Sequence, residues 1–269
     1  MHKRRTIFFI TAIFLIIVGV VFFLLQNRDE EFPFSPSNND INWMFDYDMK
    51  TWRVSGIPPT CPEPLYLPSP VNINLASGIL YPGQERGGDY KPHGGFRFDN
   101  RDTNDIEVRA IMDGIILKAS KYLEAGEEQV LLFYVNDCGV MVMHDHILTL
   151  SPKLKTALDN VPLGKEGDSR TTNIKSKVYI KKGEVLATEV GSRNFNGRKN
   201  IGIDFGLYDL RKTNGVVYGS NFRTRFPMID EYGTHAVCWL DYLEQADKSV
   251  AKSIPGADGK SGTSSDYCK

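Results

Sequence analysis

"EQVLLFYVNDCGVMVMHDHILTL", residues 128–150, decides the fold of this chain. Two apolar runs stand on either side of Asn136–Gly139, a cluster of residues that favour turns. Short runs rich in Val, Leu and aromatic residues around such a cluster predict two strands joined by a turn. Similar stretches occur twice more, and a third alternates polar with apolar residues: residues 107–120 around Asp113–Gly114, residues 177–192 around Lys182–Gly183, and residues 199–211.

Helical spacing is confined to two segments, residues 151–161 and 235–252. Closely spaced strands with few helices predict a mostly β domain, an antiparallel sandwich or barrel-like fold, over residues 46–245.

The amino terminus carries a second clear pattern. Ile7–Leu25 is an uncharged, almost wholly apolar run that would span ~28 Å as a helix, close to the thickness of a bilayer core. The basic residues Lys3–Arg5 precede it and predict a cytoplasmic tip, residues 1–6, a transmembrane anchor, residues 7–26, and an extracytoplasmic remainder. A cleaved signal peptide is the alternative, although no small-x-small cleavage site follows the run.

Composition outside the β region predicts less ordered segments. Residues 27–45 are mostly polar, with two prolines, and read as a stalk. Residues 246–269 are small and polar and are expected to be a disordered tail. The formal net charge of −1 lacks the basic excess of a nucleic-acid binder, so no nucleic-acid partner is expected.

The four cysteines are widely spaced and include no C-x-x-C pair, which argues against a zinc ribbon. Outside the cytoplasm an even number of cysteines permits disulfides in three connectivities. We expect at least one disulfide, with Cys61–Cys238 as the pair, because the two residues flank the β region.

Three of the five histidines, His93, His144 and His146, fall in the strand-rich region. On a regular strand His144 and His146 point to the same face, where two imidazoles can share a metal or relay a proton. The competing interpretation is a pair of surface histidines on a solvated strand face.

Five segments in a fixed order resemble the LytM/lysostaphin-type zinc peptidases, which cut peptide cross-bridges in bacterial cell walls. The family pattern is H-x-x-x-D, a D-G-x-V hairpin, Y-x-H-L, a glycine-containing hairpin and H-x-H-F-E. The segments here are "HGGFR" (93–97), "MDGIILKAS" (112–120), "HDHILTLS" (144–151), "VYIKKGEVLATEVGS" (178–192) and "GIDFGLYDL" (202–210). The resemblance covers residues 75–212.

The resemblance carries over to the site residues only in part. The first zinc ligand of the family falls on His93, and its aspartate ligand falls on Arg97. The histidine that assists catalysis falls on His146, and the tyrosine of that motif on His144. The histidine that acts as general base falls on Gly202, and the last zinc ligand on Asp204.

Zinc needs donors with lone pairs, and a guanidinium has none. Arg97 and Asp204 are a gained cation and a gained anion, which predicts an ion pair in place of the metal. Gly202 also lacks the base that would activate water. We therefore expect a catalytically degenerate domain without a cofactor, which binds through His93, Arg97, His144, His146 and Asp204.

If the strand register is shifted, an active enzyme is the alternative to a degenerate domain. A β-bulge at Gly94–Gly95 would let His93, Asp99 and Asp204 hold zinc, with His146 and His144 as catalytic residues. The chain would then be a metallo-endopeptidase acting on peptidoglycan or peptides.

A structural envelope module without a ligand is the third possibility. The expected partners are a cell-envelope peptide, glycan or protein, and the membrane through residues 7–26.

Overall fold

The computed structural model describes residues 41–257 and 265–268. Ile41–Lys269 form one compact unit, separate from Met1–Asp40. The expected basic tip (1–6), the anchor (7–26) and most of the stalk (27–45) lie outside the described residues. Within the described ranges, no helix is long and apolar enough to cross a membrane.

The secondary structure consists mainly of strands. In chain order the strands are β1 Asn42–Asp46, β2 Thr51–Ser55, β3 Gly78–Leu80, β4 Gln84–Arg86, β5 Asp89–Lys91, β6 Gly94–Arg97, β7 Val108–Arg109, β8 Gly114–Glu124, β9 Glu127–Val135, β10 Val140–Leu150, β11 Leu163–Glu166, β12 Thr172–Asn173, β13 Tyr179–Ile180, β14 Val185–Val190, β15 Ser192–Phe195, β16 Arg198–Asn200 and β17 Gly202–Asp209. The helices are α2 Pro152–Ala157, α3 Ser220–Arg225 and α4 Gln245–Ser253, with 3-10 helices η1 Ile73–Leu75, η2 Pro227–Ile229 and η3 Trp239–Tyr242.

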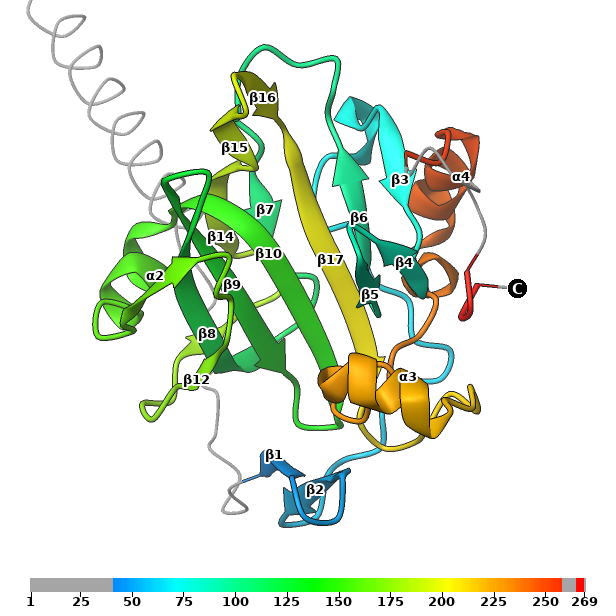
Figure 1. Ribbon diagram of the computed structural model, residues 1–269. Helices are drawn as coiled ribbons and strands as arrows, with labels where there is room; N and C mark the ends of the chain where they lie inside the picture. Colours follow the sequence, from blue (N-terminus) through cyan, green and yellow to red (C-terminus); the bar gives the residue numbers. More distant parts are fainter. Residues whose placement is uncertain (1–40, 258–264, 269) are drawn as a thin grey trace, which may run out of the picture. The chain divides into compact units, whose positions relative to one another are not determined.

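One large sheet organises the domain. Its strand order is β11-β8-β9-β10-β17-β6-β3, and the short strands β12, β13, β14 and β7 pair at its margins. All pairs are antiparallel except β11 with β8. Figure 1 shows the long strands β8, β9, β10 and β17 side by side through the middle of the domain. The mostly β prediction is confirmed, and the strand path within the described residues does not close into a barrel.

The hairpin β9–β10 forms the centre of the sheet and confirms the prediction made from residues 128–150. The backbone N–H of Asn136 donates to the carbonyl of Val140, which closes the turn. Side chains then alternate along β10: Val140 and Val142 join one apolar cluster, and Met141 and Met143 join another. Both faces of the sheet are therefore buried along this strand.

Of the other two predicted turns, the one at Lys182–Gly183 forms and the one at Asp113–Gly114 does not, and the flanking strands pair elsewhere. The chain instead bends at Ile111–Met112, after β7, which pairs with β14, and Gly114 is the first residue of β8, which pairs with β9. The turn at Lys182–Gly183 lies between β13, which pairs with β8, and β14, which pairs with β10 and β7. Turn residues predicted the bends to within a few residues, but not which strands pair.

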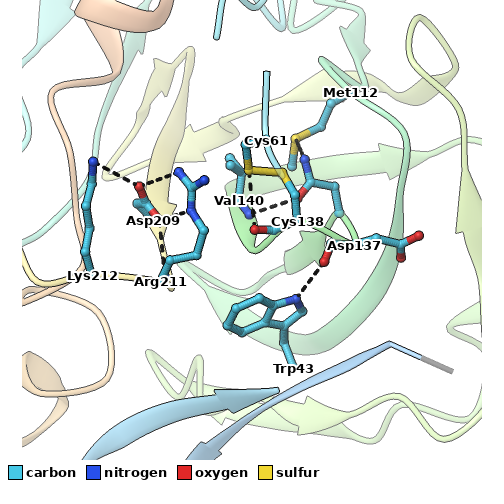
Figure 2. The surroundings of a disulfide bond; sticks show 10 residues. Trp43, Cys61, Met112, Asp137, Cys138, Val140, Asp209, Arg211 and Lys212 are labelled. Carbon is cyan, nitrogen blue, oxygen red and sulfur yellow. Dashed lines mark hydrogen bonds and ion pairs between the residues drawn. A yellow bond between two sulfur atoms is a disulfide. The ribbon is translucent and has the colours of Figure 1, made fainter. Parts of the chain in front are cut away.

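Two disulfides form, Cys61–Cys138 and Cys238–Cys268. The expectation of at least one bond is confirmed, and the pair Cys61–Cys238 is wrong. Figure 2 shows the reason: Cys138 lies in the β9–β10 turn, and the segment that carries Cys61 runs over that turn. Trp43 reaches the same turn, where its indole N–H donates to the carbonyl of Asp137 at 3.2 Å.

The carboxyl-terminal region differs from the expected tail. Residues 246–269 include most of helix α4 and a second described stretch, residues 265–268, that carries a disulfide. The single helix expected over residues 235–252 is two elements, η3 and α4. Leu243 and Glu244 separate them, and Leu243 has an extended backbone at φ −66° and ψ 143°.

Candidate functional site

A bulge in β10 separates the two histidines of the "HDH" motif. His144 pairs with Leu132 of β9 and Ile147 pairs with Val130, so one extra residue stands on the β10 side. His146 takes up this residue with a φ of 64°. The expectation that His144 and His146 share a face is wrong, because the bulge shifts the side-chain alternation by one residue.

His144 lies in the apolar core. Its ring stacks between Tyr134 and Phe205, with centroids 6.0 and 5.5 Å apart, and neither ring nitrogen has a hydrogen-bond partner. Burial lowers the pKa of His144 to about 3. His144 is therefore neutral and does not belong to the candidate site.

Asp204 is the centre of the candidate site. It lies on β17 directly opposite Gly95 of β6, and a Cβ at Gly95 would lie 3.2 Å from the Asp204 carboxylate and 2.3 Å from the carbonyl of Ile203. A glycine is needed at residue 95 because the strands approach so closely. The register runs unbroken through Gly94–Gly95, so the bulge expected there is absent and the shifted zinc site with Asp99 is wrong.

Two imidazoles lie against the Asp204 carboxylate. Oδ2 of Asp204 is 3.0 Å from Nε2 of His93 and 3.7 Å from Nε2 of His146. Burial by itself would raise the pKa of Asp204, but His93, His146 and Arg86 together hold this pKa well below its usual range. Asp204 is therefore an anion at every ordinary pH.

His146 lies next to Asp204 in a cluster of polar side chains. Its Nδ1 lies 2.7 Å from the side-chain oxygen of Gln129 and 3.5 Å from a carboxylate oxygen of Glu124. Burial alone would lower the pKa of His146, but Asp145, Asp204 and Glu124 outweigh it and raise the pKa above its ordinary value. A proton at His146 would thus be held by the surrounding carboxylates.

Asp145 accepts two hydrogen bonds next to this cluster. Its Oδ1 accepts a 2.7 Å hydrogen bond from the Tyr122 hydroxyl and another of 2.7 Å from the backbone N–H of His146. Burial, followed by the charge of Asp145, raises the pKa of Tyr122. Tyr122 therefore remains a hydrogen-bond donor rather than a base.

Arg97 does not make the ion pair expected of it. Its guanidinium bonds Asp99 at 2.6 Å, whereas Asp204 faces His93 and His146. Arg97 is paired across the sheet with Gly202, and a Cβ built on Gly202 would lie 3.0 Å from Nη1 of Arg97. The arginine thus extends over the position where the family carries its general base.

His93 lines a separate pocket of about 240 Å³, whereas Glu124, Gln129, His146 and Asp204 line one pocket of about 530 Å³. Its charged lining carries both signs: Arg86, Lys91 and Arg97 as cations, Asp99, Glu124 and Asp204 as anions. Arg86 donates to the carbonyls of Tyr81 and His93 and so joins strand β4 to the segment that carries His93. Such a mixed lining suits a polar ligand with both charged and hydrogen-bonding groups.

The donor set does not fit the zinc site of the family. A zinc site of this kind needs three protein donors, and of the three corresponding positions only His93 and Asp204 offer a lone pair. The third position is Arg97, whose guanidinium offers no lone pair and bonds Asp99. Among the side chains that the structure describes, no group of three or more His, Cys, Asp or Glu could hold a metal ion.

The structure thus brings together His93, His146 and Asp204, keeps Arg97 and Asp99 at the pocket edge, and removes His144. Sequence reasoning missed Tyr122, Glu124, Gln129 and Asp145. Gln129 was detectable as a polar residue beside the apolar run of residues 130–135. Glu124 has no local pattern, because it reaches the site only through the pairing of β8 with β9.

No family model matches the chain, and no curated protein matches it. Among solved structures, Helicobacter pylori Csd3 is similar to 70% of this chain and 40% of that chain, with a TM-score of 0.36 and 10% sequence identity. The match therefore spans less than half of that protein's length, and a likeness at this level carries no argument about function.

Proposed function

We propose that this chain is a LytM-like domain of the cell envelope that binds an envelope component and does not hydrolyse it. The proposal rests on the five ordered motifs of residues 93–210 and on the pocket they contribute to. The ligand would be a peptide, a glycan or a protein, held through His93, His146, Asp204 and Arg97. Anchoring through residues 7–26 belongs to the same proposal.

One observation carries the loss of catalysis. Arg97 and Gly202 take the positions of a zinc ligand and of the general base, and they face each other across β6 and β17. Because the guanidinium extends over Gly202, one side chain both removes a donor and covers the place from which a base would act. The zinc-ligand position and the general-base position of the family are therefore both lost at the Arg97–Gly202 pair.

The remaining polar groups support a binding role. His93 and His146 flank an ionised Asp204, and Glu124 and Gln129 lie behind His146. Apart from His93, these groups come from four neighbouring strands of one sheet, β8, β9, β10 and β17, so they are held rigidly and can recognise a polar ligand without rearrangement.

Metal content and wall binding test the proposal together. A fragment of residues 41–269 is incubated with zinc, dialysed and analysed for metal, and then sedimented with purified peptidoglycan. We expect no retained zinc, no soluble muropeptide release and co-sedimentation that falls for Asp204→Asn. Asp105→Asn, the same change at an exposed loop position, is the matched control.

The other outcomes separate the alternatives. One equivalent of retained zinc with muropeptide release would establish an active metallopeptidase, and His93, His146 and Asp204 would be the ligands to mutate first. Absence of binding to peptidoglycan and to other envelope extracts would favour a purely structural module.

Arg97→Asp sharpens the metal test. The variant restores the H-x-x-x-D spacing of the family next to Asp204. We expect it to retain zinc where the wild type does not, and to remain inactive because Gly202 supplies no base.

A further inference from the structure

The last described residues of the chain contact the strands that lead into the candidate site. Ser265–Cys268 is joined to the body of the domain by the disulfide Cys238–Cys268. The Ser265 hydroxyl donates to the carbonyl of Pro82 at 2.5 Å, and the backbone N–H of Asp266 donates to the carbonyl of Gly83 at 3.1 Å. This C-terminal latch, residues 265–268, is thus fixed at the base of the β4–β5 hairpin.

Tyr267 fits closely against that base. A Cβ at Gly83 would lie 2.9 Å from the Tyr267 ring, and Gly83 has a φ of 77°. A glycine is therefore required at residue 83 both for its backbone conformation and for the approach of the latch. The backbone N–H of Gly83 in turn donates to the carbonyl of Lys91, which closes the hairpin.

A network of hydroxyl groups joins the latch to β5. The Tyr90 hydroxyl donates to the Asp266 carboxylate at 2.7 Å and lies 3.2 Å from the Tyr267 hydroxyl. The Tyr267 hydroxyl also lies 2.8 Å from that of Tyr218. These contacts are partly buried, and burial raises the pKa of Tyr90 and Tyr267, so both hydroxyls stay protonated.

The hairpin held in this way carries one wall of the candidate site. Arg86 and Lys91 line the 530 Å³ pocket, and the Arg86 guanidinium donates to the carbonyl of His93 at 3.0 Å. His93 follows β5 by two residues and contacts Asp204. Strands β4 and β5 form a separate two-stranded sheet that pairs only with itself among the described strands. Outside the latch, the hairpin is held by the Tyr90 ring against Phe222 and Phe226 and by the ion pair of Glu85 with Arg225.

We infer that Tyr267 and the Cys238–Cys268 disulfide are positioning elements of the candidate site, which fix the β4–β5 hairpin and thereby place His93 against Asp204. Without the latch the hairpin keeps its fold but loses its fixed position, and the imidazole of His93 leaves its contact with the carboxylate. The consequence for ligand affinity rests on the proposed function, whereas the consequence for His93 does not.

The test removes the latch in two independent ways within residues 41–269, which form a unit of their own. One variant is Cys238→Ser with Cys268→Ser, and the other is Tyr267→Ala, which keeps the disulfide. The matched control is Cys61→Ser with Cys138→Ser, which removes the other disulfide. The readouts are hydrogen exchange of the amides in residues 83–91 and the NMR resonances of the His93 ring.

In both latch variants we expect hairpin amides to exchange about tenfold faster or more, with unchanged exchange in β9 and β10. The His93 ring resonances should shift in both, and Tyr267→Phe, which keeps the ring against Gly83, should restore most of the shift. The control should lower the melting temperature and leave the hairpin and His93 unchanged.

Unchanged His93 resonances in both latch variants would overturn the inference, as would equal changes in the control. Co-sedimentation with peptidoglycan gives the functional arm: affinity should fall about tenfold in the latch variants. If wild-type protein does not bind peptidoglycan at all, the proposed function fails, while the exchange and NMR results still decide the role of the latch.

Discussion

His144 and His146 stand two residues apart on β10 and belong to opposite regions of the molecule. His144 lies in an aromatic layer, where burial lowers its pKa to about 3. His146 lies in a polar pocket, where three carboxylates raise its pKa. The difference arises from one bulge residue, and it teaches that the face of a strand, rather than residue type or spacing, decides what a histidine can do.

A charge placed at His144 should give the largest effect. We expect His144→Asp to destabilise the domain by about 4 kcal/mol or more, because a carboxylate there would be buried without a partner. Urea unfolding of residues 41–269 measures this change. A loss below about 1 kcal/mol would mean that the aromatic layer admits water.

Lowering the pH should destabilise the domain through His144. The unfolded chain binds a proton at residue 144 below its ordinary pKa of 6.5, but the folded chain does not until about pH 3. The proton bound by His144 in the unfolded chain should therefore lower the free energy of unfolding by about 2 kcal/mol between pH 6.5 and about pH 5. Unfolding curves of wild type and His144→Phe, measured over this range, isolate the contribution, and parallel pH profiles would contradict it.

His146 should respond with the opposite sign. Its folded pKa is raised, so its protonated form adds stability that is fully present below pH 6.5 and lost as pH rises through the folded value. Histidine NMR titration should find His146 above its ordinary pKa. A titration midpoint of His146 below 6.5 would show that the carboxylates do not outweigh burial.

The same substitution at the two histidines should have opposite effects on stability. His144→Phe replaces a buried ring whose nitrogens are both unpaired, and we expect it to stabilise the domain by about 1 kcal/mol. His146→Phe loses the contact with Gln129 and leaves the carboxylates unneutralised, at a cost of about 1–2 kcal/mol. Melting temperatures measured in one buffer at about pH 6 compare the two directly.

The smallest effect is expected at the edge of the pocket. Arg97 pairs with Asp99, whose side chain is 58% exposed, so Arg97→Ala should change the free energy of unfolding by only about 0–1 kcal/mol. Asp99→Ala is the control and should give the same small value. A loss of 3 kcal/mol or more (about the cost of breaking a buried pair) would indicate that Arg97 turns inward to Asp204.

Local patterns predicted the mostly β fold and the central hairpin, since both depend on neighbouring residues such as those around Asn136–Gly139. The sequence also marked His93 and Asp204 as site residues, and the structure brings the two into contact. The ion pair of Arg97 was assigned to Asp204 and is wrong, because the register of β6 places Arg97 opposite Gly202 and its guanidinium bonds Asp99. The bulge at His146 depends on β10 changing its partner from β17 to β14, which no short stretch encodes.

The disulfide Cys61–Cys138 also determines which part of the domain would unfold under a pulling force. If the chain is pulled at residue 41, tension reaches Cys61 and passes through the sulfur atoms to Cys138, so residues 62–137 cannot be drawn out. The covalent path thus leads straight to the first residues of β10 and bypasses β3, β6, β8 and β9. A tether on this side of the molecule would strain β1 and β2 first and leave His93 and its pocket wall outside the stretched part of the chain.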